Sequence, residues 1–211
     1  MAGDIVFLVE GEDDHHVLLN ICGRHRIGPI SRVVQLKGVD QLGVVLAQQL
    51  RASGQAVLGV LLDADTDVTA RWQELRHVLT SVGYTDLPAQ PVEQGAIVQC
   101  PVARPDLPTF GAWIMPNNQT PGMLEDFLWQ LVPADDPLLP HAEQAISSLP
   151  VQHFKDVHRP KALMHTWLAW QAEPGKPYGQ AIKARYFDSS TQQGRAFTAW
   201  LKTLVEHRTA Q

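Results

Sequence analysis

Hydrophobic positions in the first 83 residues follow two alternating patterns. Two continuous apolar runs, at residues 5–9 and 56–62, predict strands buried on both faces; the first run is bounded by acids, so its strand is expected at 4–10, and residues 30–36 form a third strand candidate. Each strand candidate precedes a segment in which apolar residues recur with helical spacing. These segments lie at residues 13–26, 39–51 and 70–82. Alternating strands and helices predict right-handed crossovers and a parallel sheet.

The second half of the chain has a different pattern. Prolines interrupt residues 88–108, where we expect loops and a short strand at 96–102, followed by a strand at 110–115. Later segments have helical spacing, and helices are predicted at 123–132, 141–148, 160–171 and 192–206. We therefore expect an α/β fold with a mostly parallel central sheet flanked by helices. Residues 1–120 would form this core, and residues 121–211 a helical extension packed on it as one compact unit.

Composition narrows the class of protein. A hydrophobic fraction of 45% is enough for a buried core, and no apolar run is long enough to span a membrane. The 22 acidic and 17 basic residues give a net charge of −5, which argues against nucleic-acid binding through bulk positive charge but allows a local basic groove. Two distant cysteines predict neither a disulfide framework nor a zinc site. The N-terminus lacks the pattern of a secretion signal, so we expect a cytoplasmic protein.

Acidic residues end two of the predicted strands. Glu10 ends the first and Asp63 ends the third. Ligands of open parallel sheets bind at this edge, and a buried carboxylate needs a partner or a metal. If the chain stays extended, Asp63 and Asp65 lie on the same side, with Cα atoms roughly 6.5–7 Å apart. We expect Mg²⁺ bound by Glu10, Asp63 and Asp65, rather than a purely structural role, whereas Asp67 is better explained as a helix N-cap.

These motifs resemble those of a known domain. The Glu10–Gly11 pair after an apolar strand, and Asp63-Ala64-Asp65 after a later one, resemble the Toprim domain of topoisomerases, primases, recombination proteins, ribosomal RNA maturases and OLD-type nucleases. A longer likeness, to a small Toprim-like bacterial family similar to the OLD-like group, covers nearly the whole chain. It is carried by residues 113–128, 160–162 and 178–182.

The resemblance implies roles for individual residues. Glu10 would bind metal or act as a general acid or base, and Lys161 would be the basic catalytic residue. One or two Mg²⁺ or Mn²⁺ ions would bind to carboxylates from both halves of the chain. Those carboxylates belong to Glu10, Asp14, Asp63, Asp65 and Glu125.

Phosphodiester hydrolysis suits such a set of residues. The reaction needs an activated water and neutralisation of charge on the phosphoryl oxygens, and two metal ions can supply both. The sequence therefore predicts a metal-dependent phosphodiesterase, a nuclease acting on DNA or RNA.

Two other functions remain open. OLD-like Toprim domains often work with an ATPase in defence against phage, and this chain has no P-loop motif of its own. It could be a non-catalytic docking module for a separate ATPase partner, or a small-molecule phosphohydrolase with a closed pocket. A group of basic residues in the C-terminal half either follows a phosphate backbone or forms solvated helix faces. Its members are Lys155, His158, Arg159, Lys161, Lys183 and Arg185.

Overall fold

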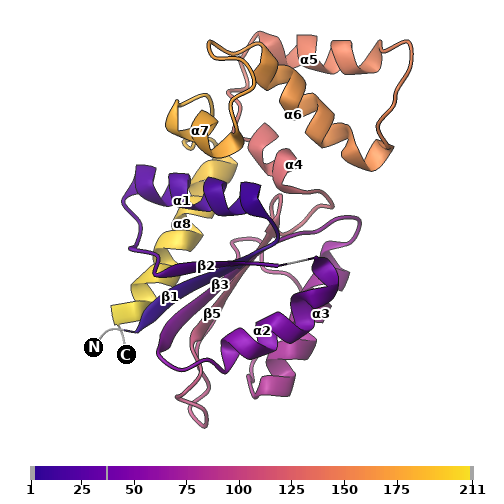
Figure 1. Ribbon diagram of the computed structural model, residues 1–211. Coiled ribbons are helices and arrows are strands. Elements are labelled where there is room, and N and C mark those ends of the chain that lie inside the picture. The colour runs from indigo at the N-terminus through magenta and orange to yellow at the C-terminus, as the bar shows by residue number, and fades with distance from the viewer. Residues whose placement is uncertain (1–2, 37, 210–211) are drawn as a thin grey trace.

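The computed structural model describes residues 3–36 and 38–209 (Figure 1). Its centre is a five-stranded sheet with the order β2-β1-β3-β5-β4. The strands are β1 (Asp4–Val9), β2 (Arg32–Gln35), β3 (Gln55–Asp63), β4 (Ala96–Val98) and β5 (Thr109–Met115). Four of them are parallel, and only the edge strand β4 runs antiparallel, against β5. The predicted mostly parallel α/β fold is therefore confirmed.

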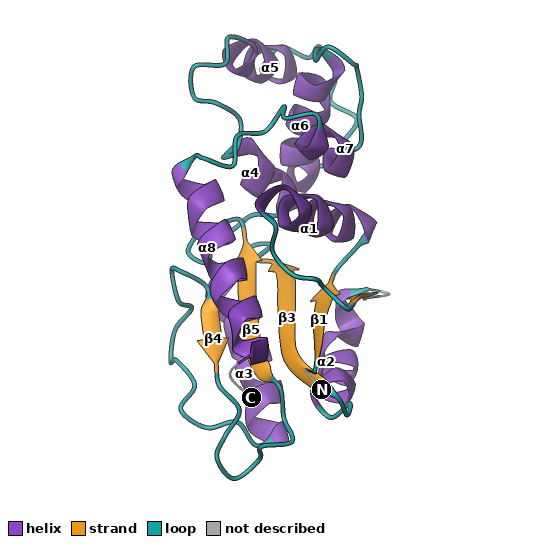
Figure 2. Cartoon of the chain, turned by 90° about the vertical axis from the view of Figure 1, so that its left-hand side faces the viewer, coloured by secondary structure: helices purple, strands orange, loops and turns teal. Residues whose placement is uncertain are grey.

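Helices cover both faces of the sheet and one of its ends. They are α1 (Glu12–His25), α2 (Leu42–Leu50), α3 (Val68–Val82), α4 (Leu124–Trp129), α5 (Leu138–Ser147), α6 (Arg159–Ala169), α7 (Tyr178–Lys183) and α8 (Gln192–Glu206). Helices α2 and α3 pack on one face, and α1 and α8 on the other. Figure 2 shows α4 to α7 beyond the ends toward which β1, β3 and β5 point. No helix in the described ranges has the length and apolarity needed to cross a bilayer.

Strand β1 shows why the apolar runs are continuous. Successive side chains of a strand point to opposite faces. Val6 and Leu8 belong to the apolar cluster under α2 and α3, whereas Ile5, Phe7 and Val9 belong to the cluster under α1 and α8. Every side chain of the run is therefore buried, as expected for a strand covered by helices on both faces.

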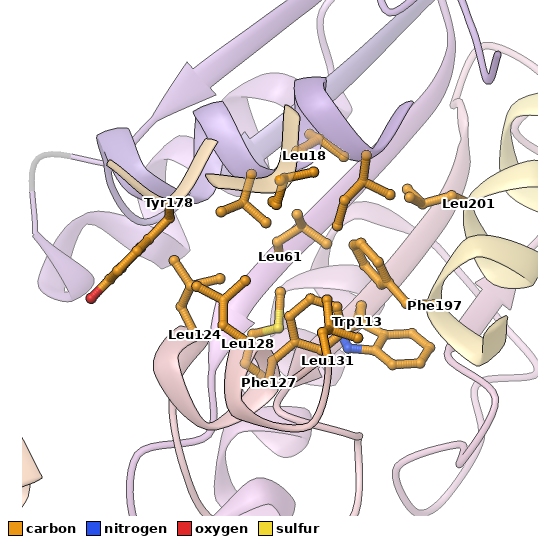
Figure 3. Packing of buried hydrophobic residues seen from close by; sticks show 14 of the residues in the cluster. Leu18, Leu61, Trp113, Leu124, Phe127, Leu128, Leu131, Tyr178, Phe197 and Leu201 are labelled. Atoms are coloured by element: carbon orange, nitrogen blue, oxygen red, sulfur yellow. The ribbon is translucent and has the colours of Figure 1, made fainter. Parts of the chain in front are cut away.

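The C-terminal helices share the core of the sheet. Leu18 of α1 and Trp113 of β5 lie in one apolar cluster with Phe127 of α4 and Phe197 of α8 (Figure 3). Helix α8 approaches β5 closely because position 111 is glycine, where a Cβ atom would lie 2.3 Å from the Leu204 side chain. The segments before and after residue 120 thus contribute to a single apolar cluster.

Some predicted boundaries were wrong. The predicted strand at 96–102 ends at Val98, three residues before Pro101, and the predicted helix at 123–132 is limited to Leu124–Trp129. Helix α7 was missed, since it has only six residues and little periodicity of its own. Its position depends on packing: at Gly179 a Cβ atom would lie only 2.8 Å from the Cβ atom of His16.

Candidate active site

Two acidic residues meet at the carboxyl edge of the sheet. Glu10 directly follows β1, and Asp63 is the last residue of β3, the parallel neighbour of β1. The Glu10 Oε1 atom accepts a hydrogen bond from the Asp63 backbone N–H at 2.8 Å. The glutamate therefore connects two strand ends, and its other carboxylate oxygen has no protein hydrogen bond among the described residues.

Asp14 is placed by the start of α1. Gly11 is the N-cap residue, and the Asp14 Oδ2 atom accepts its backbone N–H at 3.0 Å, as the third residue of a helix often does. The Asp14 Oδ1 atom is buried and has no hydrogen-bond partner. A buried carboxylate oxygen without a partner is costly, and a cation is one way to satisfy it.

The short helix α4 brings in a fourth carboxylate. Its first backbone N–H, of Leu124, donates to Asp63 Oδ1 at 2.9 Å, which joins α4 to the end of β3. The next residue, Glu125, has a side chain only 4% exposed. Glu125 Oε1 lies 3.2 Å from Lys161 Nζ of α6 and accepts the Tyr178 hydroxyl of α7 at 3.1 Å.

Tyr178 and His165 complete this side of the site, and sequence reasoning missed both. The Tyr178 hydroxyl lies 3.2 Å from His165 Nε2, and the two rings stack. Figure 3 shows the Tyr178 ring at the edge of the apolar cluster, with its oxygen pointing away from it. His165 lies in the helix predicted at 160–171, whereas Tyr178 begins α7, which was not predicted. Tyr178 stands in one of the stretches that carry the resemblance, but no pattern in the sequence indicates that the two side chains meet.

The four carboxylates and Lys161 line one cavity of about 340 Å³, to which Tyr178 and His165 do not belong. It is lined by Glu10, Gly11, Glu12, Asp13, Asp14, Asp63, Leu124, Glu125 and Lys161. Six of the nine are acidic, and one is basic. Four of the acids and the lysine were predicted from the sequence.

Burial raises the pKa values of three of these acids. Burial raises the pKa of Asp63 to about 9, and the negative charges of Glu10, Asp14 and Glu125 act in the same direction. Burial, followed by the charge of Glu10, raises the pKa of Asp14 to about 7. Burial also raises the pKa of Glu10, against the opposing effect of its hydrogen bond from Asp63. The surroundings of these three carboxyl groups therefore disfavour their ionised forms, and the cavity lining contains one lysine to offset their charge.

The donor set fits a hydrated divalent cation. Each of the four carboxylates, on Glu10, Asp14, Asp63 and Glu125, is held through one oxygen and retains a second without a protein hydrogen bond in the described ranges. Within those ranges no three His, Cys, Asp or Glu side chains form a ready-made metal-binding group. Mg²⁺ usually keeps several waters and takes one or two carboxylates directly, so a preformed protein cage is unnecessary.

Asp65 departs from the predicted geometry. The chain leaves the extended conformation after Asp63: Asp65 has a φ of 52° and forms a bridge with Gly122. Its carboxylate is 50% exposed and lies 2.8 Å from Arg71 Nη2. The expectation that Asp63 and Asp65 lie on the same side of an extended strand was therefore wrong, and Asp65 does not line the cavity.

Two further predictions concern Asp67 and the group of basic residues. Asp67 is the N-cap of α3, as expected, and accepts the backbone N–H groups of Thr69 and Ala70. The predicted basic group is divided: Lys161 lines the acidic cavity, whereas Lys183 and Arg185 line a different hollow.

Comparison with known proteins assigns the family. No curated protein and no solved structure matches the chain significantly. The sequence model described as "Protein of unknown function (DUF3226)" matches residues 4–206, a span that includes every residue of the acidic cavity. The chain belongs to the DUF3226 family.

Proposed function

We propose that this protein is a metal-dependent phosphodiesterase that cleaves DNA or RNA and uses Mg²⁺ or Mn²⁺. The observation that carries the proposal is the convergence of Glu10, Asp14, Asp63 and Glu125 on one cavity that also contains Lys161. They come from separate elements, so the fold must be complete before they meet. The resemblance of the Glu10–Gly11 and Asp63-Ala64-Asp65 motifs to Toprim nucleases supports the same function.

Four residues would hold the metal. The free oxygens of Glu10, Asp14, Asp63 and Glu125 are hard donors of the type that Mg²⁺ and Mn²⁺ prefer. When bound, a divalent cation would neutralise phosphoryl oxygens and lower the pKa of a coordinated water. The buried Oδ1 atom of Asp14 is the strongest sign that a cation belongs here, since nothing in the described chain satisfies it.

Lys161 supplies the positive charge on the substrate side. Its side chain is 49% exposed, although its Nζ atom contacts Glu125. An ammonium group has three N–H donors, so Lys161 can keep this contact and also donate to a phosphate oxygen. The negative charge that develops in the transition state would strengthen the second interaction.

Glu125 and Tyr178 keep Lys161 in place. The lysine and the Tyr178 hydroxyl both contact Glu125 Oε1, and these two contacts restrict the carboxylate. This arrangement orients the lysine toward the cavity that it lines. A phosphodiester is itself anionic, so the acidic cavity repels it when no cation is bound, and we expect activity to depend strictly on metal.

Cleavage of labelled DNA and RNA oligonucleotides, with and without Mn²⁺, tests the proposal. We expect Asp63→Asn to reduce the rate by more than about 100-fold, since outer-shell partners of metals alone are worth 10–100-fold. Asp86→Asn is the matched control, because Asp86 is an exposed loop acid with a φ of 56°, a conformation that Asn tolerates.

Three outcomes contradict the proposal. Cleavage that persists in Asp63→Asn places the chemistry elsewhere. Metal binding without cleavage of any oligonucleotide favours a docking module that works with a separate ATPase. Hydrolysis confined to small phosphate esters favours a small-molecule phosphohydrolase.

A further inference from the structure

Two more hollows lie along the junction of α1 and α7, the two helices seen side by side in Figures 1 and 2. The first has a volume of about 340 Å³ and is lined by Glu12, Asp13, His16, Asn20, Pro177, Gly179 and Gln180. The second has a volume of about 390 Å³ and is lined by Leu19, Asn20, Gly23, Arg24, Ile182, Lys183 and Arg185.

Shared residues connect these hollows to the acidic cavity. Glu12 and Asp13 line both the acidic cavity and the first hollow. Asn20 lines both the first hollow and the second. The α1 residues concerned recur every three or four positions, which places them on one face of the helix. We call this row of adjoining hollows the α1–α7 groove.

Charge changes sign along the groove. The end at the acidic cavity carries Glu12 and Asp13, and Glu12 is paired with His16 at 3.5 Å. The far end carries three cations, Arg24, Lys183 and Arg185, and none of the seven residues lining that hollow is acidic.

The cations at the far end are available to a ligand. Lys183 and Arg185 are exposed, and neither makes an ion pair or hydrogen bond through its side chain among the described residues. Arg24 is anchored by one guanidinium N–H, which donates to the Phe187 carbonyl oxygen at 2.9 Å. Its other N–H groups are not used in this way, so they can still donate to an anion.

The spacing of the two ends is set by the helices. From Asp13 to Arg24 the axis of α1 rises by about 16 Å, at 1.5 Å per residue. Gly179 lets α7 pack directly on α1, because any larger side chain would collide with His16 and Asn20. The far cations are therefore held at a fixed distance from the acidic cavity.

We propose that the α1–α7 groove binds the backbone of a nucleic acid, with phosphates on Arg24, Lys183 and Arg185 while another phosphodiester lies in the acidic cavity. The inference rests on the proposed function and specifies its substrate. A span of about 16 Å corresponds to at most about five nucleotide steps, taking the ~3.4 Å axial rise per nucleotide of a duplex strand, so a small phosphoester cannot contact both ends. Phosphate contacts of this type position a strand without reading its sequence.

The variant Lys183→Gln/Arg185→Gln tests the groove. Binding of a single-stranded DNA or RNA of about 20 nucleotides is measured by fluorescence anisotropy between about 50 and 200 mM KCl. An Asp63→Asn background prevents cleavage during the titration. We expect affinity at low salt to fall by more than about 10-fold, and the slope of log affinity against log salt to decrease by about 1.4, or 0.7 for each lost phosphate contact.

A charge-matched variant serves as the control. Arg32→Gln/Arg51→Gln also removes two exposed positive charges, from the start of β2 and the end of α2, and should leave affinity and salt slope unchanged. Turnover of a small diester, bis(p-nitrophenyl) phosphate, should be equal in the wild type and in Lys183→Gln/Arg185→Gln, because that substrate does not reach the far end.

The outcomes separate the groove from the catalytic proposal. An unchanged salt slope in Lys183→Gln/Arg185→Gln, with cleavage intact, overturns the groove alone. A reduced slope in a protein that never cleaves supports the groove and overturns the phosphodiesterase. If the double variant unfolds, Arg185→Gln alone is measured instead. It must reduce the slope of log affinity against log salt by about 0.7, and an unchanged slope contradicts the proposal that the groove binds nucleic acid.

Discussion

Two acids at the carboxyl end of β3, Asp63 and Asp65, lie in opposite electrostatic surroundings. On one side, Asp63 is buried among other carboxylates, and its pKa rises to about 9. On the other, Asp65 is half-exposed and pairs with Arg71, which also bonds to Glu74. Each of the two acids on the Asp65 side therefore contacts an arginine, whereas the six acids that line the cavity share one lysine.

This difference suggests how to interpret acidic motifs. An acid that is neutralised within the chain has a structural explanation and needs no ligand. The acids of the cavity keep an oxygen without a protein partner, although burying unpaired charge costs several kcal/mol. Such an arrangement is best explained by a ligand that supplies the missing charge.

Metal binding should show the largest difference between the two sides. We expect Asp63→Asn to weaken Mn²⁺ binding, measured by calorimetry, by more than about 100-fold. Asp65→Asn should weaken it by less than about fivefold, because an exposed ion pair is worth about 1 kcal/mol or less. Equal losses of Mn²⁺ affinity in the two variants would mean that Asp65 leaves Arg71 and joins the site. That result would contradict the difference between the Asp63 side and the Asp65 side.

Removing Lys161 should have the next largest effect. We expect Lys161→Ala to reduce kcat for oligonucleotide cleavage by about 100-fold, the usual loss when one donor to the transition state is removed. Lys176→Ala is the matched control, since Lys176 is also paired with a glutamate, Glu173, but lies outside the cavity. A kcat unaffected by Lys161→Ala would exclude a catalytic role for this lysine.

Tyr178 should act as a positioning residue with a smaller effect. In Tyr178→Phe the ring still fills the core, but Glu125 loses its hydrogen bond at 3.1 Å. Mn²⁺ affinity should fall by about 10-fold, as for other outer-shell partners of metals, with little change in thermal stability. Tyr186→Phe removes a hydroxyl whose one hydrogen bond within the described part of the chain is accepted from the Glu173 backbone N–H, and metal affinity should not respond to it.

The smallest expected difference between the Asp63 side and the Asp65 side is in how the stability of the protein depends on pH. The pKa of Asp63 is raised from its ordinary 3.8 to about 9, so between these values the unfolded chain ionises while the folded protein keeps the proton. The free energy of unfolding of the metal-free protein should therefore be fully retained below about pH 4 and should decrease as the pH rises toward 9. For one group the slope is at most about 1.4 kcal/mol per pH unit.

Chemical denaturation of the metal-free protein across this pH range measures that slope. Asp63→Asn should reduce the slope, with Asp14 and Glu10 still contributing to it, and Asp65→Asn should leave it as in the wild type. A stability that increases from about pH 5 to pH 8 in the wild type would show that the carboxylates of the cavity are not crowded in solution.

Sequence reasoning was most successful for site residues whose position follows from the local pattern of strands and helices. Glu10 and Asp63 could be placed together because each ends an apolar strand, and parallel strands bring such ends to the same edge. Asp14, in the first turn of the next helix, was associated with them only through the resemblance. Glu125 and Lys161 were assigned only through a resemblance, since no local pattern links them to the strands.

The same reasoning failed where contacts with residues far away in the sequence set the position of a side chain. Asp65 was expected to continue the strand, but a bridge to Gly122 and a contact with Arg71 turn it away from Asp63. Tyr178 and His165 lie 53 and 40 residues after Glu125 and carry no signal in the sequence for their common contact.

The sequence alone determined the alternation of strands and helices, the parallel sheet, and the two acids at its edge. These features follow from the periodicity of apolar residues and from the rule that parallel strands end together, and both act over short distances along the chain. Only the tertiary structure decided which acids share the cavity, which are neutralised, and that α1 and α7 form a groove leading away from it. Those outcomes depend on contacts between residues far apart in the sequence, where packing and charge are balanced only after the chain has folded.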